Sequence, residues 1–104
     1  GGITTDALVF SSRDSGFLAL RATEVKRNGE ITVQSATPVS LEYTAGERTT
    51  VTFYTQEETS LTLKHPAKPK QITLDGVRFK NWKYSKEKGL IVELPAGNGS
   101  LTIW

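Results

Sequence analysis

The chain of 104 residues contains no cysteine and no methionine, and His65 is its only histidine. Without cysteine it forms neither a disulfide framework nor a thiolate metal site. The single histidine precedes Pro66 and has no second group nearby in sequence to complete a nucleophilic dyad or a general-base pair. No apolar run reaches the length of a membrane span. We therefore expect a protein that is not an enzyme and that has no membrane partner.

The lack of methionine also means that this sequence does not start at an initiator residue. We expect residues 1–104 to be one β-sandwich domain excised from a larger protein. The length suits a single domain, and at this size one hydrophobic core suffices without disulfides or metals.

Helical periodicity is missing throughout the chain. Instead, apolar residues recur at every second position, and Gly, Asp, Asn or Pro interrupt the pattern at short intervals. This predicts an all-β fold, namely an antiparallel two-sheet β-sandwich, immunoglobulin-like or jelly-roll-like, with about nine or ten short strands. In the strand over 49–55, Val51 and Phe53 are expected to face the core and Tyr54 to face away from it.

Several turns follow from local chemistry. Asn28-Gly29 and Asp75-Gly76 suit type I′ hairpins, because these residues accept positive φ. Pro38 separates the strands expected at 30–35 and 39–44. Phe79 and Trp82 have opposite parity, which predicts a β-bulge or bend near Asn81.

The two prolines within 65–70 predict a connection in which the chain changes sheet, because proline donates no ladder hydrogen bond. Basic residues also gather around and beyond this connection, although the net charge is only +2. They are Lys64, Lys68, Lys70, Arg78, Lys80, Lys83, Lys86 and Lys88. Such a cluster is either a solvated strand face or a patch for an anionic polymer.

Aromatic side chains offer a second kind of binding surface, because the C–H faces of a sugar stack on Trp or Tyr rings. The candidate ligand-binding residues are Tyr54, Trp82, Tyr84, Arg78, Lys80 and Lys83. Trp104 is a further aromatic candidate. The alternative for Trp82 and Tyr84 is that both pack in the core, with their polar tips bonded at its rim.

Other chemistries have weaker support. Asp6, Asp14 and Asp75 are oxygen donors for a structural calcium ion, but their spacing is irregular, so no cofactor is expected. The pair Glu57-Glu58 is better explained as turn residues than as a glycosidase dyad. The mild net charge and the lack of a five-strand barrel pattern argue against a nucleic-acid partner.

Three motifs in the last third of the chain are Leu74-Asp75-Gly76, Trp82-Lys83-Tyr84 and Leu94-Pro95-Ala96-Gly97. With these motifs, the stretch from Pro69 to Trp104 resembles the closing β-sandwich domains of secreted carbohydrate-active enzymes. The resemblance implies an ancillary all-β module beside a glycoside hydrolase or polysaccharide lyase catalytic domain. No individual binding residue carries over from that family.

The sequence therefore leads to two hypotheses. The first is a monomeric, extracellular, non-catalytic carbohydrate-binding module that holds a catalytic domain of its parent chain on a polysaccharide, acidic if the basic residues take part. The alternative is an immunoglobulin-like structural or protein-interaction domain with no ligand of its own. The arrangement of the outward aromatic rings discriminates between them.

Overall fold

The computed structural model describes residues 2–104, and within this range the protein is all-β, with eleven antiparallel strands and no helix. The strands are β1 (Ile3–Thr5), β2 (Val9–Arg13), β3 (Gly16–Arg27), β4 (Glu30–Thr44), β5 (Thr49–Thr55), β6 (Thr59–Leu63), β7 (Ile72–Leu74), β8 (Val77–Arg78), β9 (Trp82–Ser85), β10 (Gly89–Leu94) and β11 (Gly97–Ile103). No segment of 2–104 therefore forms a helix able to cross a membrane.

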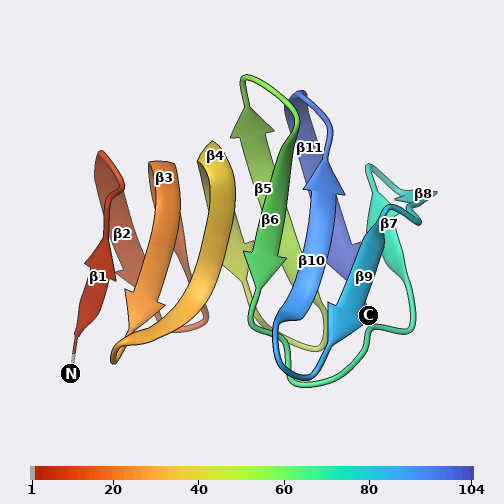
Figure 1. Ribbon diagram of the computed structural model, residues 1–104, viewed down its shortest axis with the longest axis horizontal. Coiled ribbons are helices and arrows are strands. Elements are labelled where there is room, and N and C mark those ends of the chain that lie inside the picture. The colour runs from red at the N-terminus through yellow and green to blue at the C-terminus, as the bar shows by residue number, and fades with distance from the viewer. Residues whose placement is uncertain (1) are drawn as a thin grey trace.

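Two long, bent strands, β3 and β4, organise the fold. The first part of β4 pairs with β6 through Val33–Ser35, and its second part pairs with β5 through Ser40–Thr44. In the same way, β3 pairs with β2 near its start and with β1 near its end. All strands consequently belong to one continuous sheet that curls over on itself, with β6, β10 and β9 in front of β5, β11 and β7 (Figure 1).

The prediction of an antiparallel all-β chain is confirmed, but the strands are not all short and they do not form two separate sheets. Residues 17–22 and 23–26 belong to one strand of 12 residues, and 30–35 and 39–44 belong to one strand of 15. Pro38 lies within β4, where the β3–β4 register shifts and the ladder is interrupted. An irregular register tolerates a residue that cannot donate a ladder bond.

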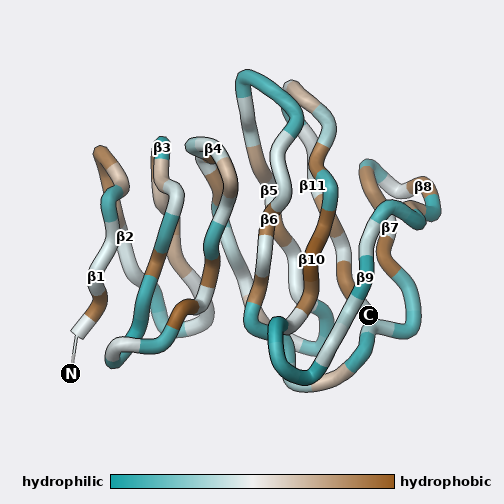
Figure 2. The backbone as a smooth tube through the Cα atoms, in the orientation of Figure 1, coloured by the Kyte–Doolittle hydropathy of each residue, from teal (hydrophilic) through white to brown (hydrophobic). Residues whose placement is uncertain are grey.

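The core lies inside the curl and is built from alternate residues of nearly every strand. In β5, Val51 and Phe53 are buried and Tyr54 is exposed, as the alternation predicts. Hydrophobic residues concentrate in the middle of β10, whereas the β9–β10 and β5–β6 turns are hydrophilic (Figure 2). Gly89, at φ +86, allows β10 to approach β6 closely, because a Cβ there would lie 2.5 Å from the Leu63 carbonyl oxygen.

Both predicted Asx-Gly turns are present. Asn28 and Gly29 have φ of 54° and 81°, and Asp75 and Gly76 have φ of 51° and 82°. These positive values at both central residues match a type I′ hairpin.

The parity change for which a β-bulge or bend was predicted near Asn81 is present, but no bulge produces it. Instead, β8 ends at Arg78 and β9 begins at Trp82, so the parity changes because the chain leaves one part of the sheet and joins another. The register shifts lie in β3, between Ala19 and Ala22 and further along that strand. Residues 64–71 connect β6 to β7, strands that pair with different neighbours, so the chain does cross the fold at the two prolines.

Candidate functional site

A cleft of about 440 Å³ lies at the free end of the sheet, where β7 and β8 face the edge strand β9. Its cationic residues come from the connector before β7, from β8 and from the segment that leads into β9. We call it the basic cleft, and its lining residues are Lys68, Lys70, Gln71, Ile72, Arg78, Phe79, Lys80, Trp82, Lys83 and Tyr84.

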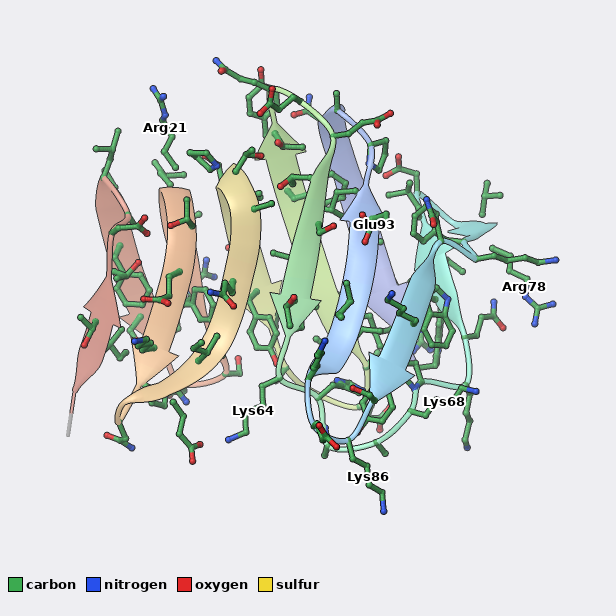
Figure 3. All side chains as sticks on the ribbon, viewed as in Figure 1. Arg21, Lys64, Lys68, Arg78, Lys86 and Glu93 are labelled. Carbon is green, nitrogen blue, oxygen red and sulfur yellow. The ribbon has the colours of Figure 1, made fainter. Side chains whose placement is uncertain are left out.

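The β7–β8 hairpin that carries Arg78 is fixed to the sheet by its turn. Asp75 N–H donates to the Ser100 carbonyl oxygen at 2.9 Å, and Asp75 Oδ1 accepts from Ser100 N–H at 2.9 Å. Arg78 itself is exposed, and Figure 3 shows its side chain directed away from the sheet. The turn therefore sets the position of a cation at the mouth of the cleft without burying it.

Trp82 and Tyr84 point inward and are half-buried. Their cross-strand partners are the buried residues Val92 and Leu90, and directly paired residues share a face of an antiparallel sheet. Trp82 Nε1–H donates to the Phe79 carbonyl oxygen at 3.0 Å. The Tyr84 hydroxyl donates to the His65 carbonyl oxygen at 3.1 Å.

The structure therefore matches the alternative given for these two rings, which is packing against the core with polar tips bonded at its rim. Both pack against the core with bonded polar tips, and they form the apolar part of the cleft wall. Together with Leu74 and Phe79, these two side chains cover the core beside the edge strand β9.

The charge of the basic cleft has a single sign. Five cations line it, Lys68, Lys70, Arg78, Lys80 and Lys83, and no carboxylate does. Within residues 2–104 the ion pairs are Arg13–Glu42, Lys26–Glu24 and Lys64–Glu30, all outside the cleft. Lys80 and Lys83 also line an adjoining pocket with Glu93, on the face of β9 and β10 that carries Ile91, so the single sign of charge is a property of the cleft lining alone. Like charges that line one cleft without a carboxylate among them create a local positive potential that attracts anions.

The other three basic residues of the predicted cluster, Lys64, Lys86 and Lys88, lie outside the cleft. A broader depression of about 970 Å³ on β4, β6 and β10 has Lys64, Lys86 and Lys88 along its rim, together with Glu30 and Glu87. Figure 3 shows the Lys64 and Lys86 side chains extending below the sheet. His65 also lines this depression, and partial burial lowers its pKa below the usual value. Here cations and carboxylates are mixed, so the charge of this surface does not have a single sign.

Five of the six predicted ligand-binding residues thus come together, and the sixth does not. Trp82, Tyr84, Arg78, Lys80 and Lys83 all line the basic cleft. Tyr54 lies on β5, with 47% of its surface exposed, in a separate pocket at the bend of β3 and β4.

The sequence placed Lys68 and Lys70 in the basic cluster, but sequence reasoning did not include them among the ligand-binding residues. Both belong to the Pro-rich connector that was recognised as a crossing segment. The connector leads into β7, next to the end of the sheet, so its lysines lie beside that end. Their position in a crossing segment was the signal that could have identified them.

The aspartates considered for calcium serve separate structural roles. Asp6 accepts hydrogen bonds from Thr23 and Glu24, and Asp75 accepts from Ser100. Asp14 lies in the β2–β3 turn. In the part of the chain that the structure describes, no three acidic or histidine side chains gather into a group able to hold a metal ion.

Comparison with known proteins gives no relative: no protein-family model matches this chain, and no curated protein matches it at a significant level.

Proposed function

We propose that this protein is a non-catalytic carbohydrate-binding module that attaches a polysaccharide-degrading enzyme to an acidic glycan through the basic cleft. The observation that carries the proposal is that five cationic and two aromatic residues line one cleft and that no carboxylate belongs to its lining. In this role the module is extracellular, acts as a monomer and belongs to a chain that also contains a catalytic domain.

The cleft provides the contacts that such a ligand requires. Arg78 can bind a carboxylate or sulfate group with two parallel hydrogen bonds, and the lysines act as mobile point charges. The half-buried Trp82 and Tyr84 supply an apolar wall for the C–H groups of a sugar ring. Each contact is weak, but retention on a polymer raises the effective concentration of substrate at the tethered catalytic domain.

The proposal includes the finer description of the fold as a two-layered sandwich, immunoglobulin-like or jelly-roll-like. Supporting it, β4 pairs with β6 in its first part and with β5 in its second part, and the buried residues of β6 and β10 join those of β5 and β11 in one core. Long strands that pass from one layer to the other through bends are a known way to make the corners of a sandwich.

The alternative function is an immunoglobulin-like structural or interaction domain that braces a catalytic domain and has no ligand. It is favoured by the internal hydrogen bonds of Trp82 and Tyr84, which occupy the polar tips of both rings. It would also explain the lysines, because charged side chains on the edge strands β8 and β9 hinder edge-to-edge association.

Affinity electrophoresis in gels that contain polygalacturonate, alginate or chondroitin sulfate separates these functions. At low ionic strength the wild-type protein should be retarded by at least one of these acidic polysaccharides. The double variant Lys80→Gln, Lys83→Gln should bind about tenfold more weakly, because two of five converging charges are lost. The matched control is Lys86→Gln, Lys88→Gln, which removes the same charge from exposed lysines outside the cleft.

Two results would reject the proposal. One is the absence of wild-type retardation in all three acidic gels. The other is an equal loss of affinity in both double variants, which would mean that only the overall charge matters.

A further inference from the structure

A third and smaller pocket, of about 270 Å³, lies where β3 and β4 bend. We call it the bend pocket. The end of β5 and the β5–β6 turn complete its wall. Its lining includes Arg21, Thr37, Pro38, Ser40, Tyr54 and Glu57. None of them lines the basic cleft.

Tyr54 supplies an uncovered aromatic ring to this pocket. It is directed outward from β5, and its cross-strand neighbours are Ser40 on β4 and Asn98 on β11. These neighbours are small and polar, so neither covers the ring, and 47% of Tyr54 is exposed. The Tyr54 hydroxyl has no hydrogen-bond partner within residues 2–104, in contrast to that of Tyr84. The ring and its hydroxyl are both available to a ligand.

Arg21 lies in an unusual backbone conformation at the same place. Its φ of 55° falls in the left-handed region, which non-glycine residues rarely adopt outside turns. Arg21 N–H donates to Ser40 Oγ at 3.0 Å, which joins the two bent strands beneath the pocket. Figure 3 shows the Arg21 side chain extending outward from the bend of β3. Glycine would adopt this backbone without strain, so the arginine side chain is the feature in need of explanation.

Thr37 adds an unsatisfied hydroxyl group. Among residues 2–104, Thr37 Oγ1 is the one buried side-chain oxygen or nitrogen without a hydrogen-bond partner. The Thr37 backbone is held in place, because its N–H donates to Thr59 Oγ1 at 3.0 Å and its carbonyl accepts from Ser35 Oγ at 2.7 Å. Buried polar atoms are normally paired, so this unpaired hydroxyl is an unusual feature of the bend in β4.

The charge of the bend pocket is balanced, with one cation, Arg21, and one carboxylate, Glu57. No ion pair within residues 2–104 joins them. An uncharged ligand that offers several hydroxyl groups can bond both side chains, whereas a charged ligand would be repelled by one of them.

We propose that the bend pocket is a second carbohydrate site, which binds a neutral sugar residue stacked on Tyr54 with its hydroxyl groups bonded by Arg21 and Glu57. The inference rests on the proposed carbohydrate-binding role but on none of the residues of the basic cleft. The module would then bind a charged part of a polysaccharide at one place and an uncharged part at another.

The test is affinity electrophoresis at high ionic strength, where the basic cleft is screened, in gels that contain mixed-linkage β-glucan, xylan, galactomannan or amylose. At least one gel should retard the wild-type protein. Tyr54→Ala should weaken that retardation tenfold or more, and Tyr54→Phe should retain most of it, because stacking needs the ring. Val77→Ala, which removes an exposed apolar side chain elsewhere, is the matched control and should bind as wild type.

Arg21→Gly separates a binding role from a structural one. It relieves the left-handed strain and should raise the melting temperature, while it weakens neutral-glycan binding. A variant that gains stability and loses affinity cannot have lost binding through unfolding.

The inference is overturned if none of the four neutral polysaccharides retards the wild-type protein, or if Tyr54→Ala is retarded as strongly as wild type. Acidic gels run on the same variants distinguish the two proposals. Retention in acidic gels without retention in neutral gels rejects only the proposal of a sugar site in the bend pocket. Retention in neither kind of gel rejects the carbohydrate-binding role as well.

Discussion

The basic cleft and the bend pocket use aromatic side chains and charges in opposite ways. The cleft holds five cations and no carboxylate, and its Trp82 and Tyr84 rings are half-buried with bonded polar tips. The bend pocket holds one cation and one carboxylate, and its Tyr54 ring is open. Attraction at the cleft is therefore mainly electrostatic, and attraction at the pocket depends on contact with a ring.

Strand position explains this difference. β9 pairs only with β10, so its inward residues close the core at the free end of the sheet. β5 pairs with both β4 and β11, and its core is already filled by Val51 and Phe53. An outward aromatic on a central strand is thus free for contact, whereas an inward aromatic on an edge strand is needed for stability.

The largest effect should come from truncating one ring of each region. Trp82→Ala should lower the free energy of unfolding by about 2–4 kcal/mol, because it removes a core-packed indole and leaves the Phe79 carbonyl without its donor. Tyr54→Ala should change it by less than about 1 kcal/mol, since the ring is largely exposed. Urea denaturation measures both. Equal losses would mean that the two rings have the same role and would break the comparison.

A smaller effect is expected from salt. Binding of an acidic polysaccharide at the basic cleft should weaken roughly tenfold between low and physiological ionic strength, because exposed charges are screened. Binding of a neutral polysaccharide at the bend pocket should stay nearly constant. Titration calorimetry over a series of NaCl concentrations gives both slopes. Parallel salt dependence for the two ligands would indicate a single shared site.

Local sequence chemistry was sufficient for much of the fold. Asn28-Gly29 and Asp75-Gly76 form the predicted turns, because positive φ is a property of those residues themselves. Alternation placed Val51, Phe53 and Tyr54 on the correct faces for the same reason.

The bends of β3 and β4 were not predictable in this way. Arg21 does not favour a positive φ, and Pro38 normally ends a strand. Their conformations are set by pairing between residues far apart in the chain, such as Ala22 with Val39. The bend pocket depends on those conformations, so sequence indicated only its ring, Tyr54. The basic cleft was easier to anticipate, because most of its residues are close together in sequence.

Val77 shows the limit of parity alone. Val77 has the same parity as Phe79, which packs against the core, yet 70% of the surface of Val77 is exposed. β8 is only two residues long and pairs only with β7, so alternation there has no second layer to bury against.

The smallest effect should be a pH dependence of stability that arises beside the bend of β3 and not at the basic cleft. Asp6 accepts hydrogen bonds from the Thr23 side chain and from the Thr23 and Glu24 N–H groups, two and three residues beyond Arg21. The Thr23 side-chain bond is the main cause that lowers the pKa of Asp6 below its ordinary value of 3.8, and the backbone bonds add to it. A carboxylate whose pKa is lower in the folded protein stabilises the fold above its unfolded pKa, and this contribution is lost as the pH falls through the folded value.

The melting temperature of the wild-type protein should therefore fall between about pH 5 and pH 2 by more than that of Asp6→Asn, which lacks the titrating group. At neutral pH, Asp6→Asn should be less stable by about 0.5–1 kcal/mol, a modest value because the group is exposed. It should weaken neutral-glycan binding, since it loosens the strand that carries Arg21, and leave acidic-glycan binding unchanged. Asp14→Asn, in the β2–β3 turn, is the control and should follow the wild-type curve. If Asp6→Asn weakened the binding of neutral and acidic glycans equally, the bend pocket and the basic cleft would have to be parts of one cooperative surface.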